Sequence, residues 1–396
     1  MKIIIVSPAY APYAGVGSMR MMSLSKYLLD KGHKVVVFRN SPHLWPKDTL
    51  KSIPPEGMDI VDVEASGSFE QCVEHYYKKL DEYYERNEVD IALYSCNPYY
   101  TIVAATKIKQ NRGTEFVIDF RDLWIKDEAL TRSIPRIIKK FLVRLPYRKY
   151  ERLCVREASA VITVSPRDCE CLKNQYPSDS KKIQVIYNGY DEARLSVGLD
   201  EDNIKATDNI VDQISESYSI GVFGKFGYYD YKYVCELLKA VKSLNTRGYN
   251  VKIVHVGELD KNSRVAMEKN DFPLEKYIGT GYMDYTAGMK ILAKVDMNCL
   301  IVHYKRGLGT KLFDYIYLNK PVVYFAQKDS AIADVLKQAD NSFLCSNSVD
   351  AAASIESIIK NQIKKLEMKN RKNFSRVTQN EKYESILNKL ILVKQV

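Results

Sequence analysis

Short apolar runs that alternate with helical stretches are the feature that most constrains how this chain can fold. Residues 2–7 (KIIIVS) form an apolar, β-branched run that ends at Pro8. The stretch 17–31 follows, with apolar residues near the 3.6-residue period of a helix and Gly32 at its end. Further strand-like runs lie at residues 34–39, 91–94, 115–119, 160–164 and 184–187. Strands that alternate with helices predict a parallel α/β sheet with right-handed crossovers.

The same pattern restarts in the second half of the chain. Residues 197–217 are polar and acidic without clear periodicity, which predicts a linker. Beyond it, strand-like runs lie at residues 219–223, 251–256, 297–302 and 321–325, with a helical stretch at 231–247. The sequence therefore predicts two Rossmann-like domains, 1–196 and 218–377, and the C-terminal helix 378–396 is a candidate to complete the first.

Composition places the chain among ordinary globular proteins. Hydrophobic residues make up 46% of the 396 residues, which excludes a disordered chain. The 59 Lys and Arg against 49 Asp and Glu give a net charge of +10, compatible with an anionic partner. We find no signal peptide and no apolar run near the ~20 residues of a membrane span, so we expect a cytoplasmic protein.

Metal-ligand patterns are missing from the sequence. The eight cysteines contain no CxxC pair, and the five histidines have no metal-ligand spacing. We therefore predict no structural zinc, no redox pair and no catalytic metal.

A loop with two glycines follows the first strand. Gly15 and Gly17 lie between that strand and the N-terminus of a helix, where backbone N–H groups and the helix dipole favour an anion or a sugar hydroxyl. A tight turn that needs glycine dihedrals explains the same residues without a ligand.

Two lysines of the second half also accompany glycines. Lys225 follows Gly224 directly after a strand, and Lys311 follows Gly309 and Thr310 before a helical stretch. Such loops suit a phosphate group, and Asp314 one turn later could accept hydrogen bonds from a ribose. A solvated lysine is the alternative interpretation of each one alone.

Charged side chains follow the strand predicted at 115–119. Asp119, Arg121 and Asp122 belong to the segment 119–124 (DFRDLW), at the carboxyl end where open α/β sheets bind ligands. A purely structural pairing of Arg121 with Asp119 or Asp122 is the alternative.

The segment 134–152 is basic and amphipathic. It holds seven Lys and Arg and one acid, Glu151, among apolar residues that include Ile137, Phe141 and Leu145. This composition predicts a helix on an anionic membrane surface, broken or kinked at Pro146. A solvated basic face is the alternative, and nucleic acid is disfavoured because no recognised binding module accompanies the segment.

The order of these motifs resembles the GT-B glycosyltransferases, specifically the retaining family 4. The segments that carry the resemblance are, in chain order, Gly15-x-Gly17, 32–35 (GHKV), 119–124 (DFRDLW), 185–191 (VIYNGYD), Gly224-Lys225 with Lys232, 279–283 (GTGYM) and 312–323 (LFDYIYLNKPVV). They extend over nearly the whole chain. The chain departs from the family at Arg306, where many members carry glutamate, at Lys225, where arginine is usual, and at Asn319, where glycine is usual.

The resemblance implies an α/β protein with two Rossmann-like domains facing a central cleft. It implies transfer of a sugar from a nucleoside diphosphate sugar to an acceptor, with retention and without a metal or other cofactor. The implied catalytic residues are Lys225, Lys311 and Asp122. The implied donor contacts are Lys232 and the amides of Gly309 and Thr310 at the diphosphate, Asp314 at the ribose, Tyr282 and Met283 at the base, and the Gly15–Gly17 loop over the donor. Arg121 and Tyr10 are expected on the acceptor side.

The implied acceptor is a lipid-linked or polysaccharide intermediate at the cytoplasmic face of the membrane. Two other functions remain open from the sequence. One is a catalytically weak GT-B-like subunit that supports another transferase, for which Arg306 leaves room. The other is an epimerase acting on a nucleotide sugar. The donor sugar, its base and the linkage are left undetermined.

Overall fold

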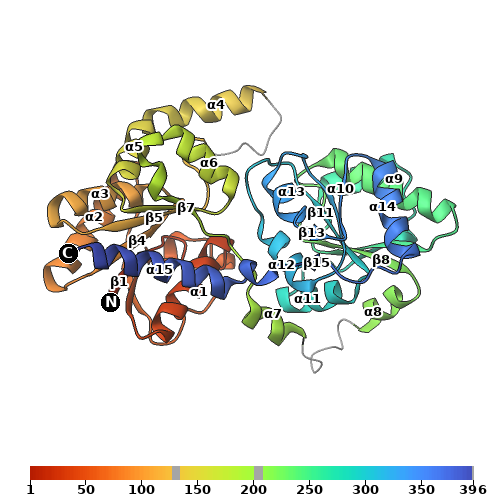
Figure 1. The fold of residues 1–396 in the computed structure, drawn as a ribbon, viewed down its shortest axis with the longest axis horizontal. Helices are drawn as coiled ribbons and strands as arrows, with labels where there is room; N and C mark the ends of the chain where they lie inside the picture. Colours follow the sequence, from red (N-terminus) through yellow and green to blue (C-terminus); the bar gives the residue numbers. More distant parts are fainter. Residues whose placement is uncertain (127–133, 200–207, 395–396) are drawn as a thin grey trace. The chain divides into compact units, whose positions relative to one another are not determined.

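A computed structural model describes residues 1–126, 134–199 and 208–394 (Figure 1). The chain forms two compact units, Met1–Asn188 with Arg376–Val396 and Gly189–Ser375. Each unit is built on a parallel sheet with helices packed against it. The predicted α/β fold of two Rossmann-like domains is therefore confirmed.

The first unit contains a seven-stranded parallel sheet in the order β3-β2-β1-β4-β5-β6-β7. Its strands are β1 (Lys2–Val6), β2 (Lys34–Asn40), β3 (Asp59–Val63), β4 (Ile91–Ser95), β5 (Phe116–Phe120), β6 (Ala160–Thr163) and β7 (Ile183–Val185). Its helices are α1 (Val16–Asp30), α2 (Phe69–Arg86), α3 (Tyr100–Arg112), α4 (Ile134–Arg144), α5 (Arg148–Glu157) and α6 (Pro166–Gln175), with α15 (Arg376–Lys394) from the C-terminus. Alternate residues of β1 enter opposite cores: Ile4 packs in the cluster with α2 and α3, and Ile3 in the cluster with α1 and α15.

The C-terminal helix α15 packs beside α1 (Figure 1). Tyr383 and Leu387 enter the same core cluster as Leu24 of α1. The side-chain amide of Asn380 also donates to the carbonyl of Ser23 over 3.2 Å. The last segment of the chain therefore completes the core of the first unit.

The second unit contains a six-stranded parallel sheet in the order β10-β9-β8-β11-β12-β14. Its strands are β8 (Tyr218–Phe223), β9 (Val251–Val256), β10 (Tyr277–Gly279), β11 (Met297–Ile301), β12 (Val322–Phe325) and β14 (Ser342–Cys345), and a separate antiparallel pair joins β13 (Ala339–Asp340) to β15 (Glu367–Met368). Its helices are α7 (Glu192–Leu199), α8 (Asp208–Ser215), α9 (Tyr231–Thr246), α10 (Lys261–Lys269), α11 (Tyr285–Lys294), α12 (Thr310–Leu318), α13 (Ala331–Leu336) and α14 (Ser348–Lys360).

The segment expected to be a linker, 197–217, contains the end of α7 and all of α8. Both helices lie in the second unit and contact α11. Within the described residues, no helix has both the length and the hydropathy that a membrane crossing requires.

Candidate functional site

Two loops of the second unit bring Lys225 and Lys311 together. Lys225 follows β8, and Lys311 lies in the first turn of α12, yet the Nζ of Lys311 donates to the carbonyl of Lys225 over 3.1 Å. Gly224 has a left-handed backbone (φ 66°), and a Cβ there would lie 3.2 Å from the Cε of Lys311. Glycine therefore gives the lysine side chain room to cross this loop.

Contacts with neighbouring elements of the second unit fix the loop after β8. A Cβ at Gly257, after β9, would lie 2.7 Å from the carbonyl oxygen of Gly224, so the two loops touch through backbone alone. Nε2 of His255 lies 2.5 Å from the same oxygen. The hydroxyl of Tyr315 accepts from the N–H of Phe223 and donates to the carbonyl of Cys299. Lys225 and Lys311 therefore stand on a rigid frame.

The electrostatics of this lysine pair favour an anion. Burial and the nearby charge of Lys225 lower the pKa of Lys311 to about 8, against the opposing influence of Asp314 and Asp260. The positive charges of the two lysines repel each other until a negative charge joins them. The pair is therefore suited to a charge-assisted contact with phosphate oxygens.

Other residues named from the sequence lie around the same edge of the sheet. Gly309 is the N-cap of α12 and offers no side-chain cap, so the amides of the first turn, Thr310 included, have no capping side chain. Asp314 is buried, and its carboxylate accepts a 2.6 Å hydrogen bond from Tyr285. Lys232 is exposed in the first turn of α9.

The loop after β10 holds the residues expected near a base. Tyr282 is 75% exposed and Met283 is half-buried, directly before α11. A bridge between Gly257 and Gly281 ties this loop to the end of β9. Arg306 is half-buried in the loop between β11 and α12.

Aromatic residues that the sequence analysis missed surround the lysine pair. The Nζ of Lys225 lies 3.9 Å from the ring centroid of Tyr228, and the Nζ of Lys311 lies 5.3 Å from that of Tyr229. The ring of Tyr304 packs edge-on against Tyr229. The only signal in the sequence is the tyrosine-rich run 228–233 after the Gly227 turn.

In the first unit, Gly17 lies against the guanidinium of Arg121. A Cβ at Gly17 would come within 1.2 Å of Nη1 of Arg121, so only glycine fits there. Arg121 donates from Nε to the carbonyl of Cys96 and from Nη2 to that of Asn97, each over 3.2 Å. Gly15 is the N-cap of α1, where a Cβ would collide with the ring of Tyr13. The glycine loop and the end of β5 therefore meet at Arg121.

Asp119 and Asp122 do not pair with Arg121, the partner considered from the sequence. Asp122 is exposed and accepts from the amide of Asn97 over 3.3 Å. Asp119 is fully buried and forms a two-bonded ion pair with Arg20 of α1, at 3.0 and 3.2 Å. No ion pair joins Arg121 to Asp119 or Asp122 in the part of the chain that the structure describes, which corrects the structural pairing considered for Arg121.

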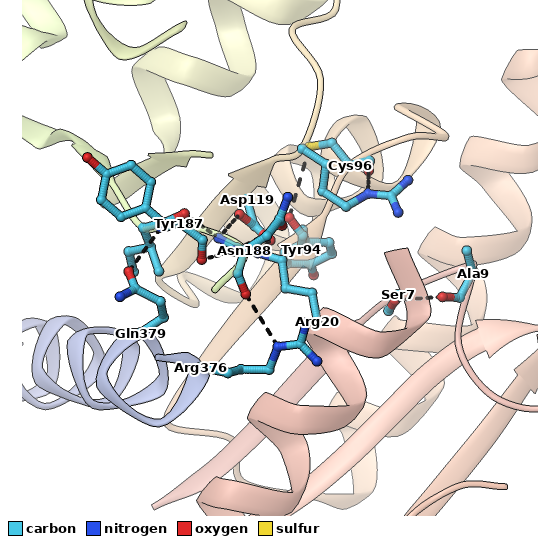
Figure 2. A network of polar contacts seen from close by, with 12 residues as sticks. Ser7, Ala9, Arg20, Tyr94, Cys96, Asp119, Tyr187, Asn188, Arg376 and Gln379 are labelled. Atoms are coloured by element: carbon cyan, nitrogen blue, oxygen red, sulfur yellow. Dashed lines mark hydrogen bonds and ion pairs between the residues drawn. The ribbon is translucent and has the colours of Figure 1, made fainter. Parts of the chain in front are cut away.

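Arg20 also binds the backbone that follows β7, near the end of the segment Met1–Asn188 (Figure 2). Its guanidinium donates to the carbonyls of Ile186 and Tyr187 over 2.9 and 2.5 Å. Arg376, at the start of α15, donates to the carbonyl of Asn188 over 3.3 Å. Arg20, which was not predicted from the sequence, is buried and joins α1 to β5 and to the residues that follow β7.

Tyr10 is a core residue. Its side chain is 1% exposed, and its hydroxyl lies 2.6 Å from Oγ of Ser25. This burial corrects the assignment of Tyr10 to the acceptor side, since a substrate cannot reach its side chain. Among the residues that the structure describes, no three His, Cys, Asp or Glu side chains gather as a metal site would require.

Comparison with known proteins identifies the two units separately. Residues 17–194 match the model of Glycosyltransferase Family 4, and residues 217–361 match that of Glycosyl transferases group 1. No curated protein matches the chain.

Solved structures share the fold over the full length of the chain. A glycosyltransferase from Rickettsia africae superposes with a TM-score of 0.72 at 16% identity, covering 99% of this chain and 98% of its own. Anabaena Alr3699/HepE in complex with UDP and glucose has a TM-score of 0.65 at 16% identity, covering 98% and 100%. The UDP-GlcNAc 2-epimerase of Neisseria meningitidis, bound to UDP-GlcNAc, has a TM-score of 0.62 at 14% identity, covering 98% and 100%. The two family models together match most of the chain, one in each half. The chain therefore belongs to the GT-B glycosyltransferases, with a family 4 first domain and a group 1 second domain.

Proposed function

We propose that this glycosyltransferase moves a sugar from a UDP-sugar to a lipid-linked or polysaccharide intermediate of cell-surface glycan synthesis, with retention and without a metal. The observation that carries the proposal is the pairing of Lys225 with Lys311 on a rigid frame at the carboxyl edge of the second sheet. The choice of uridine is supported by the similar structures, which hold UDP, UDP and glucose, or UDP-GlcNAc.

In this proposal the second unit binds the donor. Lys225 and Lys311 are the catalytic cations that stabilise the charge which develops on the diphosphate as the glycosidic bond breaks. The remaining donor contacts are Lys232 and the amides of Gly309 and Thr310 at the diphosphate, Asp314 at the ribose, and Tyr282 and Met283 at the base. Tyr285 holds the carboxylate of Asp314 in place for that role.

The first unit supplies the acceptor side. The Gly15–Gly17 loop covers the donor, and Asp122 with Arg121 faces the acceptor hydroxyl. A front-side displacement with retention lets the departing phosphate take the acceptor's proton. Asp122 then orients the acceptor hydroxyl and is not required as the base.

The donor assignment is tested by ligand binding. UDP should raise the melting temperature more than GDP or ADP, because a ligand stabilises the state that binds it. Lys225→Ala and Lys311→Ala should each weaken UDP by about tenfold in calorimetry, since charge-assisted contacts contribute about 1.5–3 kcal/mol. Lys242→Ala, an exposed lysine farther along α9, is the matched control. Unchanged UDP affinity in both variants would contradict the assignment.

The absence of a metal requirement has its own test. Lys225 and Lys311 already bring two positive charges to the diphosphate, which is the role that a divalent ion plays in other transferases. We expect UDP-sugar turnover to survive EDTA. Activity that EDTA abolishes and Mn²⁺ or Mg²⁺ restores would show that the metal-free mechanism is wrong.

An anionic membrane is the proposed docking partner of the segment 134–152. Its exposed side chains include Ile138, Leu142 and Val143, which are 53–62% exposed. The helix breaks at η3 (Leu145–Tyr147), which contains Pro146, as predicted. The side chains of Ile137, Lys140 and Phe141 lie outside the described ones.

Burial of Glu151 makes this surface more basic than the sequence suggests. The carboxylate accepts from the N–H of Ile125, the amide of Gln175 and the hydroxyl of Tyr176, and the residue is fully buried. Among the described side chains, 134–152 therefore exposes cations and apolar groups without a negative charge. Such a surface gains about 1 kcal/mol for each Lys or Arg held near anionic lipid.

Co-sedimentation with vesicles tests the membrane proposal. We expect binding to vesicles of anionic lipid at low salt, weaker binding at high salt, and none to neutral vesicles. Changing Lys139, Arg148, Lys149 and Arg152 to Gln should abolish the anionic preference. As the control, changing Lys261, Lys269, Lys337 and Lys365 of the second unit to Gln removes the same charge and should preserve the preference for anionic vesicles. A wild-type protein that ignores anionic vesicles would favour a soluble acceptor.

Epimerisation is the second candidate function, because an epimerase bound to UDP-GlcNAc shares the fold. Incubation with UDP-GlcNAc alone distinguishes the two: an epimerase changes the sugar, whereas a transferase at most hydrolyses the donor. A chain that binds UDP but transfers no sugar to any acceptor would favour the catalytically weak subunit instead.

A further inference from the structure

The ends of β4 and β5 bring three side chains together that the donor site does not use. These strands are parallel neighbours in which Ser95 pairs with Asp119, so the residues that follow emerge at the same edge. The amide of Asn97 donates to the carboxylate of Asp122 over 3.3 Å. The hydroxyl of Tyr99 donates to the carbonyl of Asp122 over 3.1 Å.

The ring of Tyr99 belongs to an aromatic stack. It lies parallel to the ring of Trp124, with centroids 5.0 Å apart and planes 3° apart. Trp124 is buried and stacks in turn with Tyr147 at 5.7 Å. Tyr99 itself is half-buried.

The backbone under these side chains is also fixed. Asn97 has a left-handed conformation, φ 73°, which is uncommon for a residue with a side chain. The guanidinium of Arg121 binds the carbonyls of Cys96 and Asn97. Residues kept in such a conformation often serve a site. Asn97 and Asp122 are both exposed residues.

An amide, a carboxylate and a flat apolar ring together match the chemistry of a pyranose. Sugar hydroxyls both donate and accept hydrogen bonds, which suits a neighbouring amide and carboxylate, while the C–H face of the ring is apolar. We propose that Asn97, Tyr99 and Asp122, the Tyr99 cluster, bind a neutral sugar ring of the acceptor. This inference rests on the proposed function and deepens it, because it states that the acceptor presents a sugar and not a bare lipid or protein.

The aromatic stack also connects the Tyr99 cluster to the basic segment. Tyr147 belongs to η3, between α4 and α5, where the proposed membrane surface lies. Trp124 thus contacts Tyr99 on the cluster and Tyr147 on the segment. A sugar seated on Tyr99 is therefore positioned close to the surface that would hold the lipid part of the same acceptor.

The test uses the full chain and a panel of methyl glycosides of glucose, galactose and N-acetylglucosamine, observed by saturation-transfer NMR. At least one glycoside should bind the wild type. Tyr99→Ala, which removes the stacking face, should weaken that glycoside by about tenfold. Asn97→Gly, which keeps the left-handed backbone and removes the amide, should weaken it by about fivefold. The control Tyr218→Ala, at a partly exposed tyrosine of the second unit, should bind like the wild type.

UDP binding in the same samples separates this inference from the proposed function. If UDP stabilises the wild type but no glycoside binds, or if Tyr99→Ala and Asn97→Gly bind as the wild type does, the Tyr99 cluster is not a sugar site. If Tyr99→Ala fails to fold, Asn97→Gly alone decides the question. Glycoside binding without UDP binding would overturn the donor proposal and leave this inference standing.

Discussion

At the residue scale, the burial of Arg20 and Asp119 has a large energetic consequence. Asp119 has no exposed surface, and its carboxylate accepts hydrogen bonds from Nε and Nη2 of Arg20. Arg20→Met should therefore destabilise the first unit by about 3–5 kcal/mol, because it leaves a buried charge uncompensated. Urea unfolding measures this loss. The double variant Arg20→Met with Asp119→Leu should recover much of it, and a single variant as stable as the wild type would refute the argument.

Lys311 makes donor binding depend on pH. Its pKa of about 8 in the folded protein, against 10.5 for a free lysine, leaves it increasingly neutral above pH 8. UDP affinity measured by calorimetry should therefore fall as the pH rises from 7 to 9, and Lys311→Arg should flatten the decline. The stability of the unliganded protein should change in the opposite direction. Between pH 8 and 10.5 the unfolded state binds more protons, so stability rises with pH.

Some of these residues could be foreseen and others could not. Lys225 follows a glycine directly after a strand, and Lys311 follows a glycine at the start of a helix, both places where parallel α/β sheets bind ligands. Arg20 stands within a helix and looks like a surface cation, since its partner Asp119 is 99 residues away. Tyr10 lies in a loop that looks exposed, and only the packing of α1 shows that it is buried.

At the scale of elements, the strands of the two parallel sheets that were not predicted from the sequence lie at the edges of those sheets. β3, β10 and β14 are each the outermost strand of a sheet and have one neighbour in it. An edge strand is partly exposed and needs no continuous apolar run, as the sequence DIVDV of β3 illustrates. The central strands, buried on both faces, were predicted because their apolar runs are continuous.

The docking of α15 depends on one carboxylate. Glu384 accepts from the hydroxyl of Tyr27 at 2.7 Å and lies 3.0 Å from Nε2 of His33. Burial opposes its charge, but these two partners outweigh it and lower its pKa below the usual 4.5. Its stabilising contribution is therefore complete above pH 4.5 and lost as the pH falls below it.

Glu384→Ala should destabilise the protein by about 1–2 kcal/mol at neutral pH, as measured by urea unfolding. The exposed Glu381 on the same helix provides the control, and Glu381→Ala should have little effect. Equal effects of the two variants would mean that the helix packs through its apolar residues alone.

At the scale of the whole molecule, the second unit is a continuous segment and the first is not. Gly189–Ser375 has its own sheet and its own core, whereas the core of the first unit includes residues from both ends of the chain. The fragment 189–375 should therefore fold alone and bind UDP within a few-fold of the intact protein. The fragment 1–188 should lack a cooperative thermal transition until a peptide of residues 376–396 is added. A cooperative 1–188 fragment would show that α15 is dispensable.

The return of α15 to the first unit also fixes a sequence of events during synthesis. As the ribosome extends the chain, the first unit emerges with the apolar surface of α1 uncovered, and the residues that cover it are translated only after the whole second unit. The second unit can fold while the nascent first unit is still incomplete. Assembly of the first unit therefore waits until the second unit has been translated, and a product truncated before α15 lacks its finished core and is a natural target for chaperones and proteases.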